Sequence, residues 1–387
     1  PIRLEVGRTL SHERTLYMRQ AILFRHWRHR DDAGRVTRIG SLRVASMAHR
    51  ATLLQSILLE PENYSATLCF DDGPEESSFV TSAGTVVALA ARTIASDVTD
   101  GAPHILALTG DGALPVEPGR RYLLDRIACL RTSRDADVPL DAARQDLADA
   151  ATPGFAADID AHLSEWTKRW RACDVRIEGD PALQRALRFA IYHLLIAANP
   201  ADPRTSIGAR SLTGSGYRGH VFWDTEIFAL PFYTLTVPDA ARALLMYRHF
   251  TLPAARRRAA TIGCDGALFA WESADTGEDV TPATVVFPDG TLVPVLTGQL
   301  AQHISADVAY ACWQYWRATG DDAFALEAGA ELIVETARFW ASRVRRGTDG
   351  LHHIDGVIGP DEYHVPVDDN AYTNGMARWN LTAAVRT

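Results

Sequence analysis

The chain has 387 residues, of which 47% are hydrophobic and 22% are charged, a composition typical of a globular protein with more than one domain. Its formal net charge of -9 argues against nucleic acid and against an anionic membrane as the main partner, because both attract an excess of Lys and Arg. The sequence has no uninterrupted apolar stretch near the ~20 residues that span a bilayer, and its five widely spaced cysteines favour free thiols in the cytoplasm.

The first third of the chain, residues 1–137, is predicted to form an antiparallel β-sandwich. Polar and apolar residues alternate over 2–6 and 41–44, and apolar or β-branched runs follow at 85–89 and 122–130. Turn-forming Asp, Gly and Pro clusters separate these runs, as they do in all-β domains. The basic run at 25–30 is interpreted as a solvated face or a strand edge.

Helical spacing begins near residue 138. Residues 140–151 and 156–171 are predicted to be helices of a linker over 138–178, and residues 179–387 continue with helix after helix. Asn370 is predicted to cap the last helix. Long irregular stretches at 203–222, 263–297 and 347–369 alternate with the helices, which favours an α/α toroid over a simple bundle. The apolar stripes that define three of the helices are Leu183, Leu187, Ile191 and Leu194; Ile304, Val308, Cys312 and Tyr315; and Leu326, Ile333, Ala337 and Trp340.

Three loop clusters combine aromatic residues with carboxylates beside Gly or Pro. They occupy 216–226, 269–278 and 359–372. Sugar binding uses this pairing, because the apolar face of a pyranose stacks on an indole while carboxylates accept hydrogen bonds from its hydroxyl groups. A single pair of this kind is usually a core Trp beside a capping acid. Three clusters on one helical array favour a sugar site.

Glu362 is the best candidate for a proton donor, because Gly359 and Pro360 force a turn before it and Tyr363 is expected to form an apolar wall that raises its pKa. The alternative is an ordinary turn in which an Arg pairs with Glu362. A metal site is an alternative for this region, but the spacing of its candidate ligands matches no common zinc pattern. Those candidates are His352, His353, Asp355, Asp361, Glu362 and His364. The sequence contains neither a nucleophile elbow nor a phosphate-binding P-loop.

The sequence resembles glycoside hydrolase family 65 at these clusters. The matching motifs are Gly-Ser-Gly-Tyr-Arg-Gly-His-Val-Phe-Trp-Asp-Thr-Glu at 214–226, Trp-Glu-Ser-Ala-Asp-Thr-Gly-Glu at 271–278, His-Ile-Ser-Ala-Asp at 303–307, Gly-Pro-Asp-Glu-Tyr-His at 359–364 and Asp-Asn-Ala-Tyr-Thr-Asn at 369–374. The resemblance implies an N-terminal β-sandwich (1–137), a helical linker (138–178) and the first part of an (α/α)6 catalytic barrel (179–387). It also implies an inverting reaction with Glu362 as the general acid. The substrate-binding residues that it implies are Trp223, Asp224, Trp271, Glu272, Arg218, His220 and Asn370.

The reaction implied by the resemblance is the phosphorolysis of an α-glucosyl disaccharide to β-glucose 1-phosphate. Inorganic phosphate is the co-substrate, no cofactor or metal is expected, and a homodimer is the assembly that the family suggests. The residues that would separate a phosphorylase from an inverting, acid-trehalase-like hydrolase are expected beyond Thr387, so the chain is interpreted as a piece of a longer protein that is inactive alone. A noncatalytic sugar-binding subunit is the third hypothesis.

Overall fold

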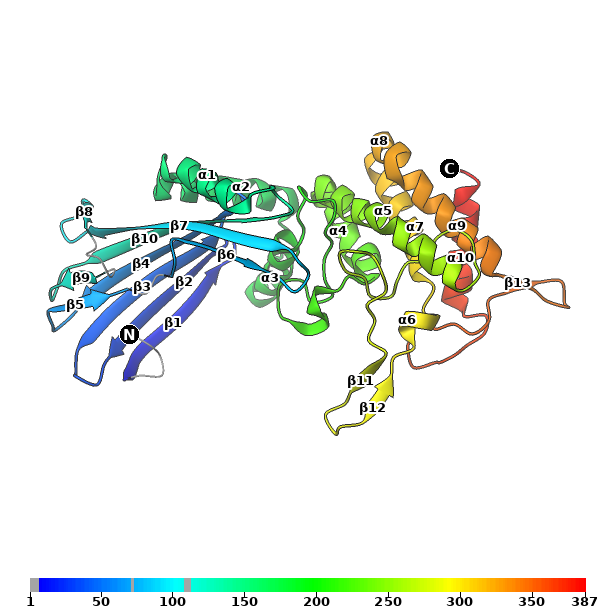
Figure 1. The fold of residues 1–387 in the computed structure, drawn as a ribbon, viewed down its shortest axis with the longest axis horizontal. Coiled ribbons are helices and arrows are strands. Elements are labelled where there is room, and N and C mark those ends of the chain that lie inside the picture. The colour runs from blue at the N-terminus through cyan, green and yellow to red at the C-terminus, as the bar shows by residue number, and fades with distance from the viewer. Residues whose placement is uncertain (1–6, 71–72, 108–112) are drawn as a thin grey trace. The chain divides into compact units, whose positions relative to one another are not determined.

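The computed structural model describes residues 7–70, 73–107 and 113–387. The chain forms two compact units, Pro1–Asp174 and Val175–Thr387, which are described separately here (Figure 1). The strand predicted over 2–6 lies outside the described residues. Both helices that the sequence assigns to a linker belong to the first unit, and the three-part division remains a prediction.

The first unit is built on an antiparallel sheet. Its strands pair in the order β1-β2-β3-β4-β10-β7-β6, with β8 also pairing with β7, and β5 pairs with β9 in a second sheet. The predicted antiparallel character is confirmed, as are strands at the expected positions 41–44, 85–89 and 122–130. The bounds are β1 Arg8–Tyr17, β2 Ile22–Arg30, β3 Val36–Ala45, β4 Thr52–Pro61, β5 Ala66–Cys69, β6 Glu76–Val80, β7 Val86–Asp97, β8 His104–Leu106, β9 Ala113–Val116 and β10 Tyr122–Thr132.

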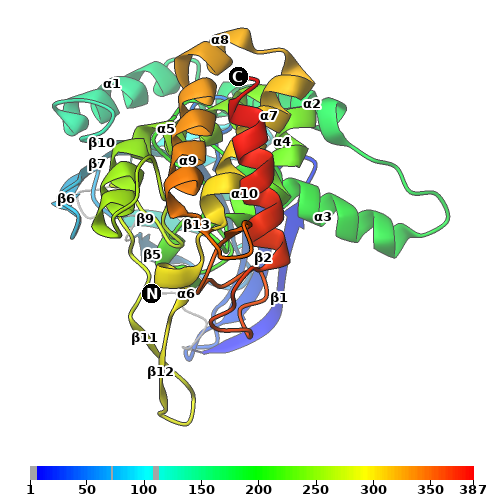
Figure 2. The same ribbon diagram turned by 90° about the vertical axis from the view of Figure 1, so that its right-hand side faces the viewer.

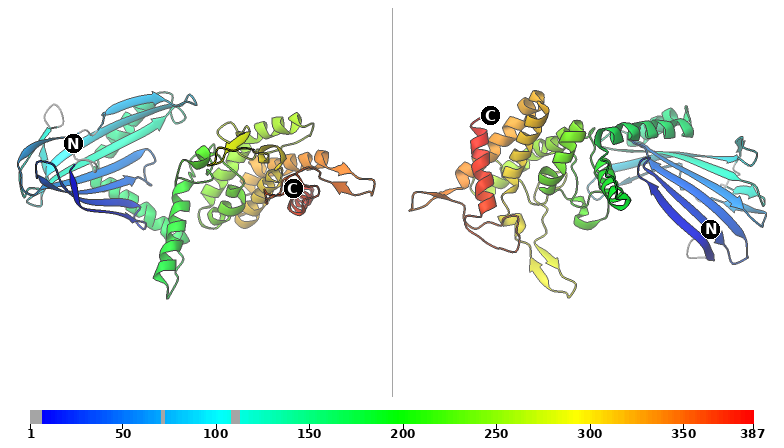
Figure 3. Two further views of the ribbon diagram at one scale, coloured as in Figure 1. Left: turned by 90° about the horizontal axis from the view of Figure 1, so that it is seen from below. Right: turned by 180° about the vertical axis from the view of Figure 1, so that it is seen from behind.

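The central strands of the large sheet are covered on both faces, whereas β1 and β6 at its edges are mostly exposed. Leu54 of β4 opposes Ile127 of β10, and both belong to a core that also includes residues of α1 (Pro139–Ala151) and α2 (Phe155–Cys173). Leu59 opposes Tyr122 in the same pair of strands, and this pair packs with residues of β5 and β9. Since side chains alternate between the faces of a sheet, α1 and α2 cover one face and β5–β9 the other. Figure 3 shows α1 lying along the strands.

The basic run at 25–30 lies in β2, which pairs with β1 on one side and β3 on the other. The interpretation of this run as a strand edge is therefore wrong. Its charges are accommodated by partners on neighbouring strands and loops: Arg28 binds Glu62 at 2.6 Å, and Arg25 donates to His12 at 2.9 Å. The charges of this run suggested an edge, but pairing with strands on both sides places β2 inside the sheet.

The second unit is a helical array around α7 (Ile304–Thr319), which packs against α4, α5, α9 and α10. Figure 2 shows α9 and α10 side by side at the surface of this unit. A hairpin of β11 (Thr284–Val286) and β12 (Leu292–Pro294) projects from the helices in Figures 1 and 2. The other bounds are α3 Pro181–Ala197, α4 Leu230–Thr236, α5 Pro238–Thr261, α6 Thr297–Leu300, α8 Asp322–Phe324, α9 Ala330–Arg343, β13 Arg345–Arg346, β14 His352–His353 and α10 Ala371–Ala384.

The predicted helical stripes are partly correct. All four residues of the α7 stripe are buried, and Ile333, Ala337 and Trp340 of α9 are buried as expected. Leu326, however, is 88% exposed, because it lies in a wider turn at Ala325–Gly329 that precedes α9 and shifts the helical phase. Leu183 at the start of α3 is also exposed. Across the described residues, none of the helices combines the length and apolar character that a membrane span requires.

Candidate active site

The first and second loop clusters are joined by their backbones. Val221 and Ser273 exchange N–H to carbonyl hydrogen bonds of 2.9 and 3.0 Å, as residues of paired strands do. Tyr247 of α5 fastens the second cluster by donating to the carbonyl of Ala274 at 2.7 Å, and its hydroxyl lies 2.9 Å from Ser273 Oγ. Two loops that lie about fifty residues apart along the sequence therefore form one wall.

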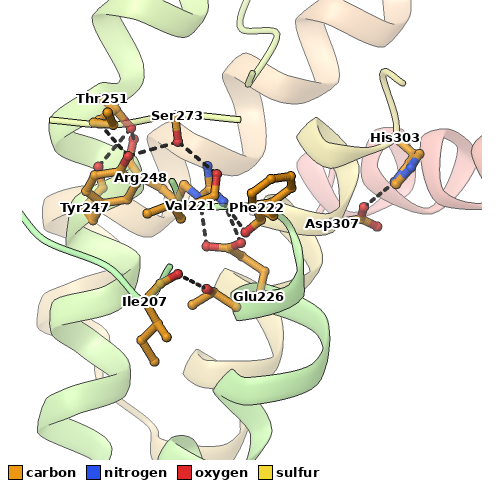
Figure 4. A network of polar contacts seen from close by, with 12 residues as sticks. Ile207, Val221, Phe222, Glu226, Tyr247, Arg248, Thr251, Ser273, His303 and Asp307 are labelled. Carbon is orange, nitrogen blue, oxygen red and sulfur yellow. Dashed lines mark hydrogen bonds and ion pairs between the residues drawn. The ribbon is translucent and has the colours of Figure 1, made fainter. Parts of the chain in front are cut away.

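A buried ion pair anchors the first cluster to α5. Arg248 binds both oxygens of Glu226, at 2.8 and 2.7 Å, and its Nη2 also donates to the carbonyl of Phe222 at 3.0 Å (Figure 4). The two side chains are 0% and 1% exposed, so the pair is closed to water. Because the carbonyl of Phe222 and the carboxylate of Glu226 flank Trp223 and Asp224, the guanidinium group holds the backbone on both sides of this predicted pair.

Aromatic rings bring all three clusters together. The His303 ring lies 4.8 Å from that of Trp223, 6.1 Å from that of Trp271 and 5.4 Å from that of Tyr372, measured between centroids. Trp271 is buried and also packs edge-to-face on Phe222. The structure thus places both predicted sugar-stacking indoles around one imidazole.

Two of the other predicted residues are paired with each other. His220 Nδ1 lies 2.8 Å from Glu272 Oε2, and Glu272 is only 6% exposed. The pair leaves the second carboxylate oxygen of Glu272 available to a hydroxyl group. Arg218 is different: it is exposed in a left-handed turn with a φ of 53°, and within the described part of the chain no hydrogen bond or ion pair joins its side chain to this group.

Glu362 is an exposed residue whose carboxyl group is nevertheless partly desolvated. This burial raises the pKa of Glu362, the negative charge of Asp224 raises it further, and His303 opposes them. The predicted apolar wall of Tyr363 is wrong, because that side chain is 97% exposed. The contacts of Asp361 explain why the Tyr363 side chain points outward. Asp361 accepts a hydrogen bond from the N–H of Tyr363 at 3.1 Å and pairs with His364 at 2.7 Å. These contacts form a tight turn that leaves the Tyr363 side chain on its outer side.

Asn370 begins α10 as predicted. Its Oδ1 accepts the backbone N–H of Thr373 at 3.0 Å and the Thr373 hydroxyl at 3.2 Å, which is the pattern of a helix N-cap. Gly359 packs tightly on the same amide, since a Cβ added there would lie 2.4 Å from Asn370 Nδ2. Asn370 thus supports the loop that carries Glu362, and its predicted contact with sugar remains a prediction.

Four of the six residues considered as metal ligands form ion pairs or hydrogen bonds within the protein instead. His353 lies between Asp369 at 2.6 Å and Asp349 at 3.1 Å, His364 pairs with Asp361, and Asp355 pairs with Arg345. Among the residues that the structure describes, His, Cys, Asp and Glu side chains do not form a group of three or more that is able to hold a metal ion.

Sequence reasoning missed the importance of His303, Asp307 and Tyr372 as side chains. His303 Nδ1 lies 2.7 Å from Asp307 Oδ2, and the Tyr372 hydroxyl donates to Asp307 Oδ1 at 2.8 Å. The His-x-x-x-Asp spacing at the start of a helix was a signal for the first contact, because residues four apart share a helical face. The contact with Tyr372 joins α7 to α10, and nothing local predicts it.

Comparison with known proteins gives family matches over both units. The model described as the N-terminal domain of glycosyl hydrolase family 65 matches residues 1–169, and that of the family's central catalytic domain matches residues 188–387. A kojibiose phosphorylase of Caldanaerobacter subterraneus is 38% identical over 98% of this chain and 55% of its own length. A kojibiose hydrolase of Flavobacterium johnsoniae is 39% identical over 70% of this chain and 38% of its own length.

A solved structure with the same fold is that of a protein provisionally named kojibiose phosphorylase, from the human microbiome. It has a TM-score of 0.83 and 22% identity, and the match covers 100% of this chain and 53% of that one. The Caldanaerobacter match and this one cover nearly all of this chain, and the chain spans about half the length of each of these relatives. On the two family matches, which together cover most of the sequence, the chain belongs to glycosyl hydrolase family 65.

Proposed function

We propose that this chain belongs to an inverting phosphorylase that cleaves an α-glucosyl disaccharide, with Glu362 as the proton donor. The observation that carries the proposal is the grouping of Trp223 and Trp271 around the His303 ring. It is supported by the direction of the pKa of the Glu362 carboxyl group, which partial desolvation and the charge of Asp224 raise. Helices α3 to α10 are proposed to be the first part of an (α/α)6 barrel.

In the proposed reaction, Glu362 donates its proton to the glycosidic oxygen, and the bond from this oxygen to the anomeric carbon breaks. A phosphate oxygen attacks the same carbon from the opposite face, so the α-glucoside becomes β-glucose 1-phosphate and a free sugar leaves. Phosphate is already an anion near neutral pH and therefore needs no protein base. No cofactor enters this scheme.

The glucosyl unit is proposed to stack against Trp223 and Trp271, with Asp224 and Glu272 accepting hydrogen bonds from its hydroxyl groups. His220 is proposed to orient Glu272, to which it is bonded. Arg218 and Asn370 are the weakest members of the set, because Arg218 is exposed and the Asn370 oxygen already caps α10. A cytoplasmic location is part of the proposal and is supported by the five cysteines, all of which are described and are free thiols.

Hydrolysis is a second candidate, because a kojibiose hydrolase is among the relatives. Water would then replace phosphate as the nucleophile, and it would need a carboxylate base. Kojibiose is the first substrate to test, since relatives of both kinds are named for it. Turnover of kojibiose by the full-length protein in phosphate buffer and in phosphate-free buffer separates the two reactions.

The proton donor is tested by Glu362→Gln in the full-length protein. We expect kcat to fall roughly 100- to 10,000-fold, because positioned proton transfer contributes an acceleration of that order. Glu327→Gln is the matched control: it makes the same exchange at an exposed carboxylate that pairs with Arg242, and it should leave turnover unchanged. Equal turnover by Glu362→Gln and the unaltered protein would remove Glu362 from its role as proton donor.

A further inference from the structure

The imidazole of His303 has one satisfied nitrogen and one unsatisfied nitrogen. His303 immediately precedes α7 and is fully buried, as is Asp307 in the first turn of that helix. Nδ1 of His303 is bonded to Asp307 at 2.7 Å, as Figure 4 shows. Nε2 is buried and has no hydrogen-bond partner among the described residues.

The proton on this ring can be assigned from its neighbours. The Tyr372 hydroxyl donates to one oxygen of Asp307, and burial together with the charge of Asp307 raises the pKa of Tyr372, so this hydroxyl keeps its proton. The other oxygen of Asp307 can only accept, which places a hydrogen on His303 Nδ1. In a neutral ring Nε2 then carries a lone pair, and it faces away from Asp307.

The aromatic neighbours of the His303 ring indicate which kind of ligand Nε2 is able to meet. The nearest aromatic neighbours of the ring include Trp223 and Trp271, the two indoles proposed to hold the glucosyl unit. A buried acceptor without a partner destabilises the free protein, and a donor that arrives with a ligand removes this penalty.

We propose that His303 is a specificity-determining residue of this site, and that its Nε2 accepts a hydrogen bond from one hydroxyl group of the glucosyl unit between Trp223 and Trp271. This inference rests on the proposed function. Sites built around a buried polar group strongly reject analogues that leave this group unpaired. Asp307 and Tyr372 act as positioning residues, because they fix the ring and its tautomer.

The test uses full-length protein, kojibiose and the four kojibiose analogues that each lack one hydroxyl group of the non-reducing glucose. In the unaltered protein, removal of the bonded hydroxyl should lower kcat/KM roughly 10-fold or more. The variant His303→Asn keeps an amide near the position of Nδ1 but loses Nε2. It should lower kcat/KM for kojibiose roughly 10- to 100-fold and show no further loss on that same analogue. His303→Gln places its amide near Nε2 and should retain more activity than His303→Asn.

Three results would overturn the inference. If the unaltered protein has the same kcat/KM for all four analogues as for kojibiose, no buried acceptor forms an important hydrogen bond with a hydroxyl group of the glucosyl unit. If His303→Asn loses the same factor on every analogue, the residue supports the fold only, and the proposed function still stands. If the unaltered protein cleaves no α-glucosyl disaccharide with or without phosphate, the proposed function is wrong and this inference falls with it. Thermal unfolding of each variant identifies those that fail to fold. The comparison of kojibiose with its four analogues uses the unaltered protein and therefore does not depend on any variant.

Discussion

At the scale of single residues, the site depends on the unequal environments of its carboxyl groups. Burial is the largest influence that raises the pKa of Glu362, the negative charge of Asp224 adds to it, and His303 acts in the opposite direction. A carboxyl group with a raised pKa keeps its proton to higher pH, which a general acid requires. The loss of activity on the alkaline side of the pH profile should therefore report the titration of Glu362.

The variant Asp224→Asn tests this coupling in the full-length protein. Removing the negative charge lowers the pKa of Glu362, so the acid loses its proton at a lower pH. The alkaline limb of the profile of kcat/KM against pH should therefore move to lower pH. Asp224→Glu retains the charge and should leave the limb nearer its original place. A limb that stays fixed or moves to higher pH in Asp224→Asn would show that Asp224 does not act on the proposed proton donor.

At the scale of elements, loops rather than helices carry the candidate site, and α5 holds two of the loops. Arg248 binds the first cluster through Glu226 and Phe222, while Tyr247 binds the second through Ser273 and Ala274. Arg248 and Glu226 are enclosed, so their attraction is screened little by water. The position of Trp223 and Asp224 therefore depends on Arg248, a residue of a helix that comes later in the chain.

The variant Arg248→Met should lower the free energy of unfolding of the helical unit by about 3–5 kcal/mol, because Glu226 is left as a buried charge without its partner. Replacing both residues, as Glu226→Gln with Arg248→Met, should restore part of this loss. Arg257→Met on the same helix is the control: its ion pair with Glu278 is exposed and should contribute only ~0–1 kcal/mol. Urea unfolding of the three variants measures the differences, and equal losses for Arg248→Met and Arg257→Met would contradict the role of the buried pair.

At the scale of the whole molecule, each compact unit has its own hydrophobic core. Leu54 lies in the core between the sheet and helices α1 and α2, whereas Leu332 lies in the core around α7. Both side chains are almost completely buried, with exposures of 2% and 0%. Separate cores allow separate unfolding transitions, as is common in proteins of more than one domain.

We expect Leu54→Ala and Leu332→Ala to destabilise different transitions. Each leaves a cavity in one core, at a cost of about 2–5 kcal/mol. Calorimetry of the 387-residue chain should show the transition of the first unit lowered by Leu54→Ala and that of the second unit lowered by Leu332→Ala. A single transition that both substitutions lower equally would mean that the two units unfold together.

The sequence by itself determined the features that depend on residues close together along the chain. The apolar stripe of α7, the Asn370 cap and the antiparallel strands follow from spacings within a few residues. The motifs that carry the family resemblance are local in the same sense, and the family matches confirm them. The motif around Glu362 identifies it as a candidate acid, but the predicted apolar wall of Tyr363 is absent because that side chain is exposed.

Only the tertiary structure decided which of these local pieces meet. The basic run at 25–30 became an inner strand because β1 and β3 pair with it on both sides, and Leu326 became exposed because a wider turn shifted the phase of its helix. The hydrogen bond from Tyr372 to Asp307, the residue that also binds His303, joins side chains 65 positions apart. Such contacts are settled by the packing of whole helices and sheets, since the free energy that selects them comes from burial shared among many distant residues.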